Sequence, residues 1–231
     1  MSRNRSHKPP KKSGPKKIVR GNFNVHDKWF ELAKKEGYRA RSAYKLIQLD
    51  EKFDLIQPGM NVLDVASAPW SWLQVLSRRV EEDGMVIWFD LQPIKSLKKE
   101  NVKTFTGNIF EKEEVNRNIL KTMKEETGNW KLVTGNCHQI FDLMTSDIAP
   151  KTTGHKDIDQ YASIELNLAI LDLANEFLKP GWNLVMKVFI GEDVNDLIQP
   201  VKKHFKKLQR FSPPAVRRRS FEEYFVCLGK K

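Results

Sequence analysis

The 231-residue sequence is poor in cysteine and contains no long hydrophobic run. Its two cysteines, Cys137 and Cys227, lie far apart and form no CxxC pair, which disfavours a disulfide framework and a zinc site. No segment approaches the ~18 uninterrupted apolar residues that a membrane-spanning helix needs. The N-terminus also lacks the apolar core of a secretory signal. We therefore expect a cytoplasmic protein without a structural metal.

Two common nucleotide-binding motifs are also missing. The sequence has no GxGxxG fingerprint and no phosphate loop with a Lys-Ser/Thr pair. Dinucleotide-dependent enzymes and P-loop NTPases are therefore disfavoured.

Acidic residues are absent from the first 20 residues, which hold eight lysines and arginines. We expect residues 1–25 to form a disordered basic tail and residues 26–231 to form a single domain. A second basic group lies near the C-terminus and comprises Lys202, Lys203, Lys206, Lys207, Arg210, Arg217, Arg218 and Arg219. With the net charge of +11, these two groups favour a nucleic-acid partner over a merely solubilising surface.

Apolar and amphipathic segments alternate along the rest of the chain. Strands are predicted at residues 61–66, 85–91, 102–106, 141–146 and 183–189. Helices are predicted at residues 26–39, 42–50, 71–82, 111–127 and 158–178. Ser42 is the expected N-cap of the second helix, and Pro180-Gly181 is expected to end the last. The alternation indicates a mostly parallel sheet covered on both faces, with strands near 206–211 and 222–228 pairing antiparallel.

Ligands of such sheets bind beyond the carboxyl ends of the strands, so polar residues there are candidates for function. Asp90 ends the second predicted strand, where a carboxylate can accept two hydrogen bonds from a ribose diol. Lys187 interrupts the apolar run LVMKVF, and buried lysines are rare unless they are paired or functional. Singly these signals are weak, because an acid at a strand end is usually a turn former or helix cap.

In order, the segments GYRARSAYKL, VLDVASAPWSW, FDLQP, SDIAP, LKPG, MKVFIGE and SFEEYFVCLG resemble the FtsJ/RrmJ family of ribose 2′-O-methyltransferases over residues 26–229. The resemblance implies an α/β, Rossmann-like methyltransferase fold with a seven-stranded, mostly parallel sheet and helices on both faces. It also implies S-adenosylmethionine as cofactor and RNA as partner, and we expect a monomer.

The family's catalytic Lys-Asp-Lys-Glu set maps onto Lys45, Asp147, Lys187 and Glu222. Burial and the Lys45 cation favour a neutral amine at Lys187, whereas the two carboxylates favour an ammonium. Two roles for Lys187 therefore stay open: the base that takes the ribose proton, or the cation that stabilises the alkoxide. Without the family pattern, Lys45 reads as a solvated helix lysine and Glu222 as an edge-strand charge.

The resemblance places the cofactor at Trp70, Trp72, Asp90, Asn108 and Asp147, with Asn108 replacing the family's usual aspartate near the adenine. Asp147 is expected to belong both to the catalytic set and to the cofactor-binding residues.

Three tryptophans stand where the family usually has glycine or another small residue: Trp70, Trp88 and Trp182. We hypothesise that their codons are UGA, which the source organism reads as glycine. The alternative is three independent substitutions, with weakened or lost cofactor binding. Trp29 and Trp72 suit their contexts.

The short layout and the GYRARSAYKL segment are most like the ribosomal branch of the family, which acts on a uridine of large-subunit ribosomal RNA. Methylation of transfer RNA is the close alternative. A non-catalytic RNA-binding or ribosome-assembly factor is another, supported by Trp70 taken literally. A metal-dependent catechol-type methyltransferase is disfavoured because no metal-binding carboxylates cluster at the strand ends.

Overall fold

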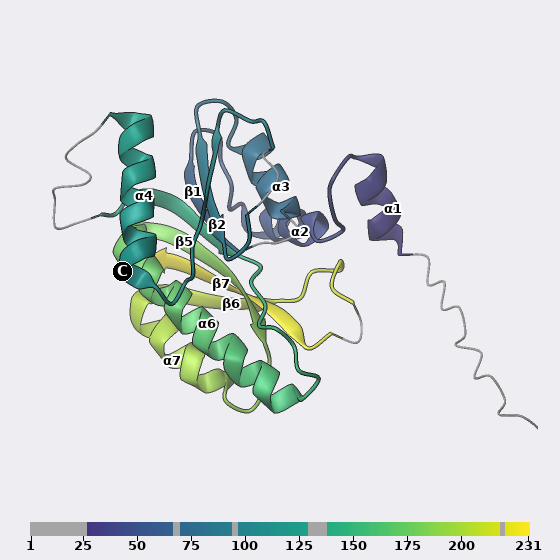
Figure 1. The fold of residues 1–231 in the computed structure, drawn as a ribbon. Coiled ribbons are helices and arrows are strands. Elements are labelled where there is room, and N and C mark those ends of the chain that lie inside the picture. Colours follow the sequence, from purple (N-terminus) through teal and green to yellow (C-terminus); the bar gives the residue numbers. More distant parts are fainter. Residues whose placement is uncertain (1–26, 67–69, 94–96, 129–137, 218–219) are drawn as a thin grey trace, which may run out of the picture.

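The computed structural model describes residues 27–66, 70–93, 97–128, 138–217 and 220–231 (Figure 1). The basic tail expected at residues 1–25, Cys137 and the pair Arg218–Arg219 lie outside these residues. No helix within the described ranges is long and apolar enough to cross a membrane.

A seven-stranded sheet forms the centre of the molecule, with the strand order β3-β2-β1-β4-β5-β7-β6. The strands are β1 (Asn61–Val65), β2 (Met85–Asp90), β3 (Val102–Thr106), β4 (Phe141–Ser146), β5 (Leu178–Phe189), β6 (Phe205–Phe211) and β7 (Glu222–Lys230). The first five strands pair in parallel, whereas β7 runs antiparallel to both β5 and β6. The predicted strand order along the chain and the antiparallel final pair are confirmed.

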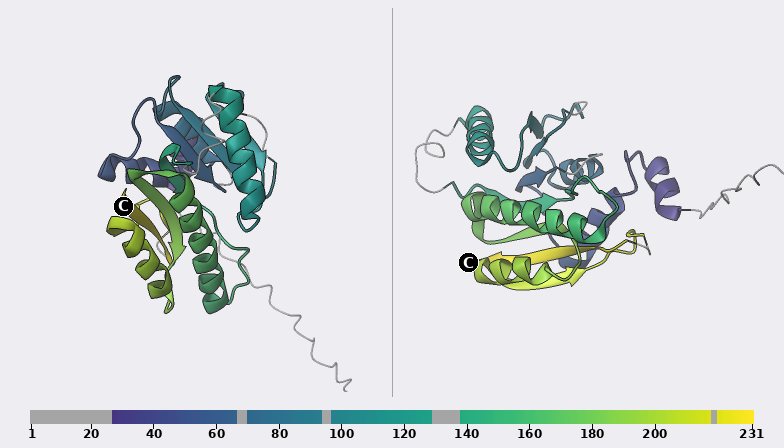
Figure 2. Two further views of the ribbon diagram at one scale, coloured as in Figure 1. Left: turned by 90° about the vertical axis from the view of Figure 1, so that its left-hand side faces the viewer. Right: turned by 60° about the horizontal axis from the view of Figure 1, so that its bottom comes forward.

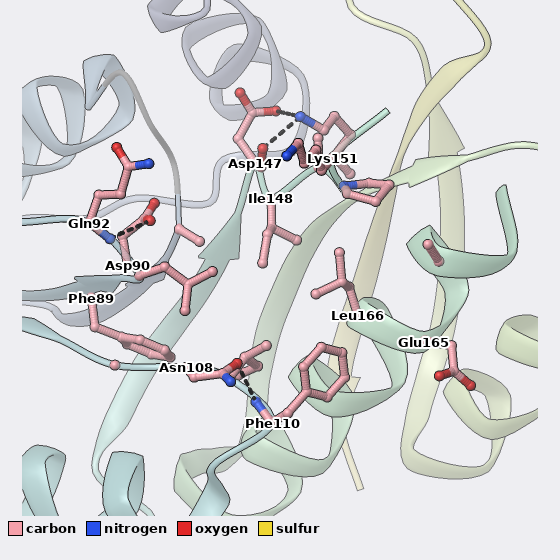
Figure 3. Close-up of a pocket in the computed structure, with 18 of the residues that line it drawn as sticks. Phe89, Asp90, Gln92, Asn108, Phe110, Asp147, Ile148, Lys151, Glu165 and Leu166 are labelled. Atoms are coloured by element: carbon pink, nitrogen blue, oxygen red, sulfur yellow. Dashed lines mark hydrogen bonds and ion pairs between the residues drawn. The ribbon is translucent and has the colours of Figure 1, made fainter. Parts of the chain in front are cut away.

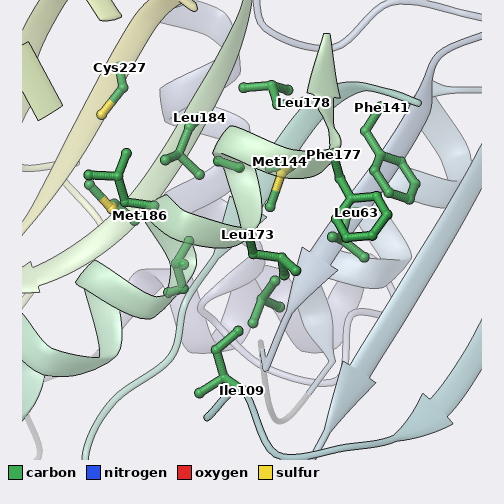
Figure 4. Packing of buried hydrophobic residues seen from close by; sticks show 14 of the residues in the cluster. Leu63, Ile109, Phe141, Met144, Leu173, Phe177, Leu178, Leu184, Met186 and Cys227 are labelled. Carbon is green, nitrogen blue, oxygen red and sulfur yellow. The ribbon is translucent and has the colours of Figure 1, made fainter. Parts of the chain in front are cut away.

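Helices cover both faces of this sheet, as expected (Figures 1 and 2). They are α2 (Ala43–Phe53), α3 (Ser71–Arg79), α4 (Lys112–Thr127), α6 (Lys156–Phe177) and α7 (Val194–His204), whereas α1 (Lys28–Lys35) packs against α2. Helices α2 and α3 pack on one face around Leu46 and Leu73, and α4, α6 and α7 pack on the other (Figure 4). Neighbouring strand residues such as Val62 and Leu63 belong to opposite clusters, because side chains alternate between the faces of a strand.

Two local features differ from the sequence-based predictions. Helix α7 was not predicted, although its buried residues Val194, Leu197 and Val201 recur at helical spacing; Pro200 within it argues against a helix. Strand β5 begins at Leu178 instead of residue 183, so Pro180-Gly181 lies within the strand. An irregularity in the β4–β5 register there accommodates the extra residues.

Ser42 occupies the N-cap position of α2 as predicted, but its side chain does not cap the helix. Its hydroxyl lies 2.6 Å from the hydroxyl of Ser71 and forms a hydrogen bond there. This contact ties the start of α2 to the start of α3, beside the carboxyl end of β1.

Candidate active site

A cavity of about 700 Å³ opens beyond the carboxyl ends of β1, β2 and β4 (Figure 3). Its volume lies within the usual range of small-molecule and cofactor sites. Parallel strands end at the same edge of the sheet, which is why residues distant in sequence meet there. Five of the residues predicted for the site line the cavity: Trp70, Asp90, Asn108, Asp147 and Lys187.

Asn108 lies at one end of the cavity, and Asp90 lies on the cavity wall between Asn108 and Asp147 (Figure 3). Burial raises the pKa of Asp90, and hydrogen bonds from the backbone N–H groups of Gln92 and Leu91 oppose that shift. The side-chain oxygen of Asn108 accepts a hydrogen bond of 3.2 Å from the N–H of Phe110, which fixes the turn after β3. Asp90 therefore presents a carboxylate that can accept the hydroxyl groups of a ribose.

Lys187 and Asp147 form a buried ion pair at the other end of the cavity. The ammonium nitrogen of Lys187 lies 3.1 Å from Oδ1 of Asp147 and donates a hydrogen bond of 2.6 Å to its backbone oxygen. Each side chain is less than a tenth exposed. Both of these partners are acceptors, so the surroundings suit the charged form of the lysine.

Tyr224 joins this pair from the neighbouring strand β7, directly opposite Lys187 in the sheet register. Its hydroxyl donates a hydrogen bond of 2.7 Å to Oδ1 of Asp147. Burial raises the pKa of Tyr224 well above its usual value, and the charges of Asp147 and Glu222 add to the shift. The sequence analysis missed Tyr224, although the two-residue spacing from Glu222 places both on one face of the strand.

Lys45 and Glu222 form a second ion pair, with 2.5 Å between the ammonium nitrogen and Oε1. The Lys45 nitrogen also lies 5.7 Å from the centre of the Tyr224 ring. The four residues predicted as catalytic thus meet as two ion pairs, and Tyr224 contacts both.

Trp72 occupies a different place from the other predicted cofactor residues. It is fully buried, and its indole N–H donates a hydrogen bond of 2.9 Å to the backbone oxygen of Ser42. Its ring stacks at a tilt on Tyr224, with 5.6 Å between centroids. Trp72 is not among the described residues that line the cavity. It instead packs against Tyr224 on the side away from the cavity and so holds that residue in place.

Trp70 lines the cavity in a backbone conformation that suits glycine. Its φ angle is +69°, and its indole N–H is buried without a hydrogen-bond partner among the described residues. The guanidinium of Arg39 lies 5.2 Å from the ring centre. Ala66, another residue of the cavity wall, also has a positive φ of +50°. L-amino acids with a side chain pay about 1 kcal/mol or more for this conformation.

The described residues contain no cluster of three or more His, Cys, Asp or Glu side chains that could hold a metal ion. The cavity instead combines apolar walls, an aspartate at the end of β2 and a buried lysine–carboxylate pair. Together with the strand order, these features define a Rossmann-like, S-adenosylmethionine-dependent methyltransferase.

Comparison with known proteins identifies the family. Residues 38–230 match the family described as FtsJ-like methyltransferase, and the chain belongs to that family. It is 38% identical over 208 residues to the ribosomal RNA large subunit methyltransferase E of Methanocaldococcus jannaschii, covering 89% of this chain and 80% of the relative. The protein of the same name from a Psychrobacter species is 39% identical over 204 residues, covering 88% of this chain and 90% of the relative.

Solved structures agree on the fold. A Plasmodium falciparum protein described as a ribosomal RNA methyltransferase superposes with a TM-score of 0.69 at 28% identity, covering 84% of this chain and 98% of the other. Aeropyrum pernix fibrillarin, solved with bound S-adenosyl-L-methionine, gives a TM-score of 0.50 at 12% identity, covering 81% of this chain and 76% of the other. The second likeness concerns the fold alone.

Proposed function

We propose that this chain transfers a methyl group from S-adenosylmethionine to a ribose 2′-oxygen of large-subunit ribosomal RNA. The observation that carries the proposal is the buried Lys187–Asp147 pair at the end of the cavity, with Tyr224 bound to the same carboxylate. The names of the most similar relatives support the choice of ribosomal RNA. Action as a monomer in the cytoplasm is part of the same proposal.

The cofactor, when bound, supplies an electrophilic methyl group on a sulfonium. Asp90 would hold its ribose hydroxyls, and Asn108 would lie beside its adenine. Asp147 would lie at the methionine end. Trp70 also lines this cavity, and its backbone conformation suits glycine better than a residue with a side chain.

Lys187 is the residue best placed to act on the ribose hydroxyl. An ammonium has three N–H donors, and the described contacts to Asp147 use two acceptors. The third donor can hold the 2′-oxygen and stabilise the negative charge that develops as the hydroxyl proton passes to solvent water and the methyl group leaves the sulfonium. Of the two roles left open by the sequence, this geometry favours the stabilising cation.

The other members of the set position Lys187. Asp147 holds the lysine through two atoms, and Tyr224 fixes the carboxylate in turn. Lys45 and Glu222 neutralise each other beside Tyr224, which keeps a second charged pair next to the ribose. Such preorganised charges stabilise a transition state without rearranging during the reaction.

The test is transfer of labelled methyl from S-adenosylmethionine to large ribosomal subunits that lack 2′-O-methylation, with transfer RNA assayed in parallel. Three proteins would be compared: the chain as written, a version with glycine at positions 70, 88 and 182, and that version carrying Lys187→Ala. Labelling of the subunits that Lys187→Ala abolishes is the expected result.

Two other outcomes would overturn parts of the proposal. Preferential labelling of transfer RNA would move the substrate to that class. If neither version with intact Lys187 labels either RNA, the chain is better explained as a non-catalytic RNA-binding factor, for which Trp70 is the supporting observation.

A further inference from the structure

A second, smaller cleft of about 280 Å³ opens beside the Lys45–Glu222 pair. We call it the basic cleft; its lining residues are Arg41, Ser42, Lys45, Arg217, Ser220 and Glu222. It lies between the start of α2 and the loop that precedes β7. None of its residues lines the larger cavity, so it is a separate surface.

The basic cleft has more positive than negative charge. Its one carboxylate, Glu222, is already paired with Lys45. Arg41 is anchored by an ion pair with Asp27 and by a hydrogen bond to the backbone oxygen of Ala215. No described residue forms an ion pair or side-chain hydrogen bond with the guanidinium of Arg217.

The two arginines of the cleft are close enough to repel each other. The pKa of Arg41 is lowered, first by burial and then by the charge of Arg217, while Glu222 opposes the shift. An anion bound between the guanidinium groups would relieve this repulsion and accept hydrogen bonds from them.

Two serine hydroxyls complete the cleft. The hydroxyl oxygen of Ser220 accepts a hydrogen bond of 3.3 Å from the backbone N–H of Glu222, so its own hydrogen is available for donation. Guanidinium and hydroxyl donors around a small space match the several oxygens of a phosphate group.

The basic cleft lies close to Lys187, the residue proposed to act on the ribose hydroxyl. Glu222 is opposite Phe189 in the β5–β7 register, and Lys187 precedes Phe189 by two residues. Two residues of a strand span about 7 Å. In RNA, the phosphate nearest a 2′-oxygen is the one on the adjacent 3′-carbon of the same ribose.

We propose that the basic cleft binds the 3′-phosphate of the nucleotide to be methylated, with Arg217 as its principal ligand. This inference rests on the proposed function, because it assumes that the ribose lies at Lys187. Arg217 is then a positioning residue: it holds the strand so that the 2′-oxygen meets Lys187. Such a contact sets the register of the RNA and does not choose the base.

The first test compares Arg217→Gln with Lys121→Gln, a matched loss of one charge at an exposed position of α4 outside both basic groups. The probe is a single-stranded RNA of about a dozen nucleotides, and its Kd is measured as a function of salt concentration. Arg217→Gln is expected to raise Kd about tenfold and to reduce the slope of log Kd against log salt by about 0.7. The same weak effect in both variants would overturn the proposal.

The second test addresses the phosphate itself, once the methylated nucleotide has been mapped. Oligoribonucleotides that end at that nucleotide are compared with and without a 3′-phosphate. The phosphate should lower KM about tenfold for the unaltered chain and have little effect for Arg217→Gln, with partial recovery in Arg217→Lys. An equal benefit in the unaltered chain and Arg217→Gln would contradict the assignment.

The two proposals fail in different ways. Absence of methyl transfer by the unaltered chain and by its glycine version counts against the proposed function, and the salt dependence of RNA binding still tests Arg217. Normal transfer with no effect of Arg217→Gln counts against the basic cleft alone. The affinity for S-adenosylmethionine should stay unchanged in Arg217→Gln, since none of the cleft residues lines the cofactor cavity.

Discussion

The catalytic end and the cofactor end of the site differ in how well their side chains are satisfied. At the catalytic end, Lys45, Asp147, Lys187 and Glu222 each have an oppositely charged partner within 3.1 Å. At the cofactor end, Trp70 has a left-handed backbone and a buried indole N–H without a described partner. Local choices in a natural sequence normally agree with the fold, so the conflict at Trp70 requires an explanation.

The other tryptophans sharpen this contrast. The indole N–H groups of Trp29 and Trp72, which suit the family pattern, donate to the backbone oxygens of Pro214 and Ser42. Those of Trp70 and Trp88 are buried without a described partner. Trp182 is half-buried and directly follows Gly181. The indole contacts thus separate the tryptophans at 70 and 88 from those at 29 and 72, whereas Trp182 is not among the buried unpaired groups.

The largest difference that we expect is in the identity of residues 70, 88 and 182 in the native protein. Protein isolated from the source organism should yield peptides with glycine at positions 70, 88 and 182, and mass spectrometry of those peptides is the measurement. Trp72 serves as the internal control and should be read as tryptophan. Tryptophan at all four positions would end the hypothesis.

Lys187→Ala tests the catalytic end. Methyl transfer should fall about a thousandfold or more, because the group that stabilises the developing alkoxide is lost. The affinity for S-adenosylmethionine, measured by calorimetry, should change little.

A matched control exists on the same two strands, where Lys179 forms an ion pair of 2.7 Å with Asp142. Lys179→Ala should leave transfer within about twofold, since this part-buried pair lies at the start of β5, at the other end of the strand from Lys187. Equal losses in both variants would show that the strand, and not the site, had been damaged.

Trp70→Gly tests the cofactor end. It removes a side chain from a backbone position with φ near +69° and relieves a buried, unpaired N–H group. We expect affinity for S-adenosylmethionine to increase about tenfold. Weaker binding in the variant would show that the indole is part of the cofactor site.

Tyr224→Phe separates the hydrogen bond to Asp147 from the packing of the ring on Trp72. The rate constant for transfer should fall about tenfold to a hundredfold, the effect of one hydrogen bond to a charged group. Thermal unfolding checks that the variant is folded. A loss as large as that of Lys187→Ala would give Tyr224 a direct part in the chemistry.

The smallest expected effect concerns pH. Because burial raises the pKa of Asp90, this carboxylate gains its proton at a higher pH than an exposed aspartate. Affinity for S-adenosylmethionine should therefore begin to weaken at a higher pH than it would with an exposed aspartate, as the carboxylate that accepts the ribose hydroxyls becomes protonated. Asp90→Asn should bind more weakly at neutral pH and lack this dependence. The same pH dependence in Asp90→Asn would place its origin elsewhere.

Much of the fold was predictable because strands and helices alternate with clear apolar periodicity. Asp90 and Asp147 could be placed at one edge of the sheet for the same reason. Helix α7 and the early start of β5 could not be predicted, since Pro200 and Pro180 argue against regular structure locally and tertiary packing overrides them.

It was harder to predict which side chains pair with one another than to predict which residues lie in the site. The family resemblance placed Lys45 and Glu222 in the site, but their pairing depends on the approach of α2 to β7. Tyr224 was missed because an apolar strand offers no local sign that one hydroxyl reaches a carboxylate. Arg217 belonged to a basic run, and only the fold places it beside Arg41.

The most direct test of the central claim is the chemical position of the transferred methyl group. Large subunits labelled by the glycine version of the chain would be digested to nucleosides and separated by chromatography with mass detection. We predict the label in a single 2′-O-methylribonucleoside of the large-subunit RNA, and none after Lys187→Ala. Label on a base, or equal labelling by the Lys187→Ala variant, would contradict the account.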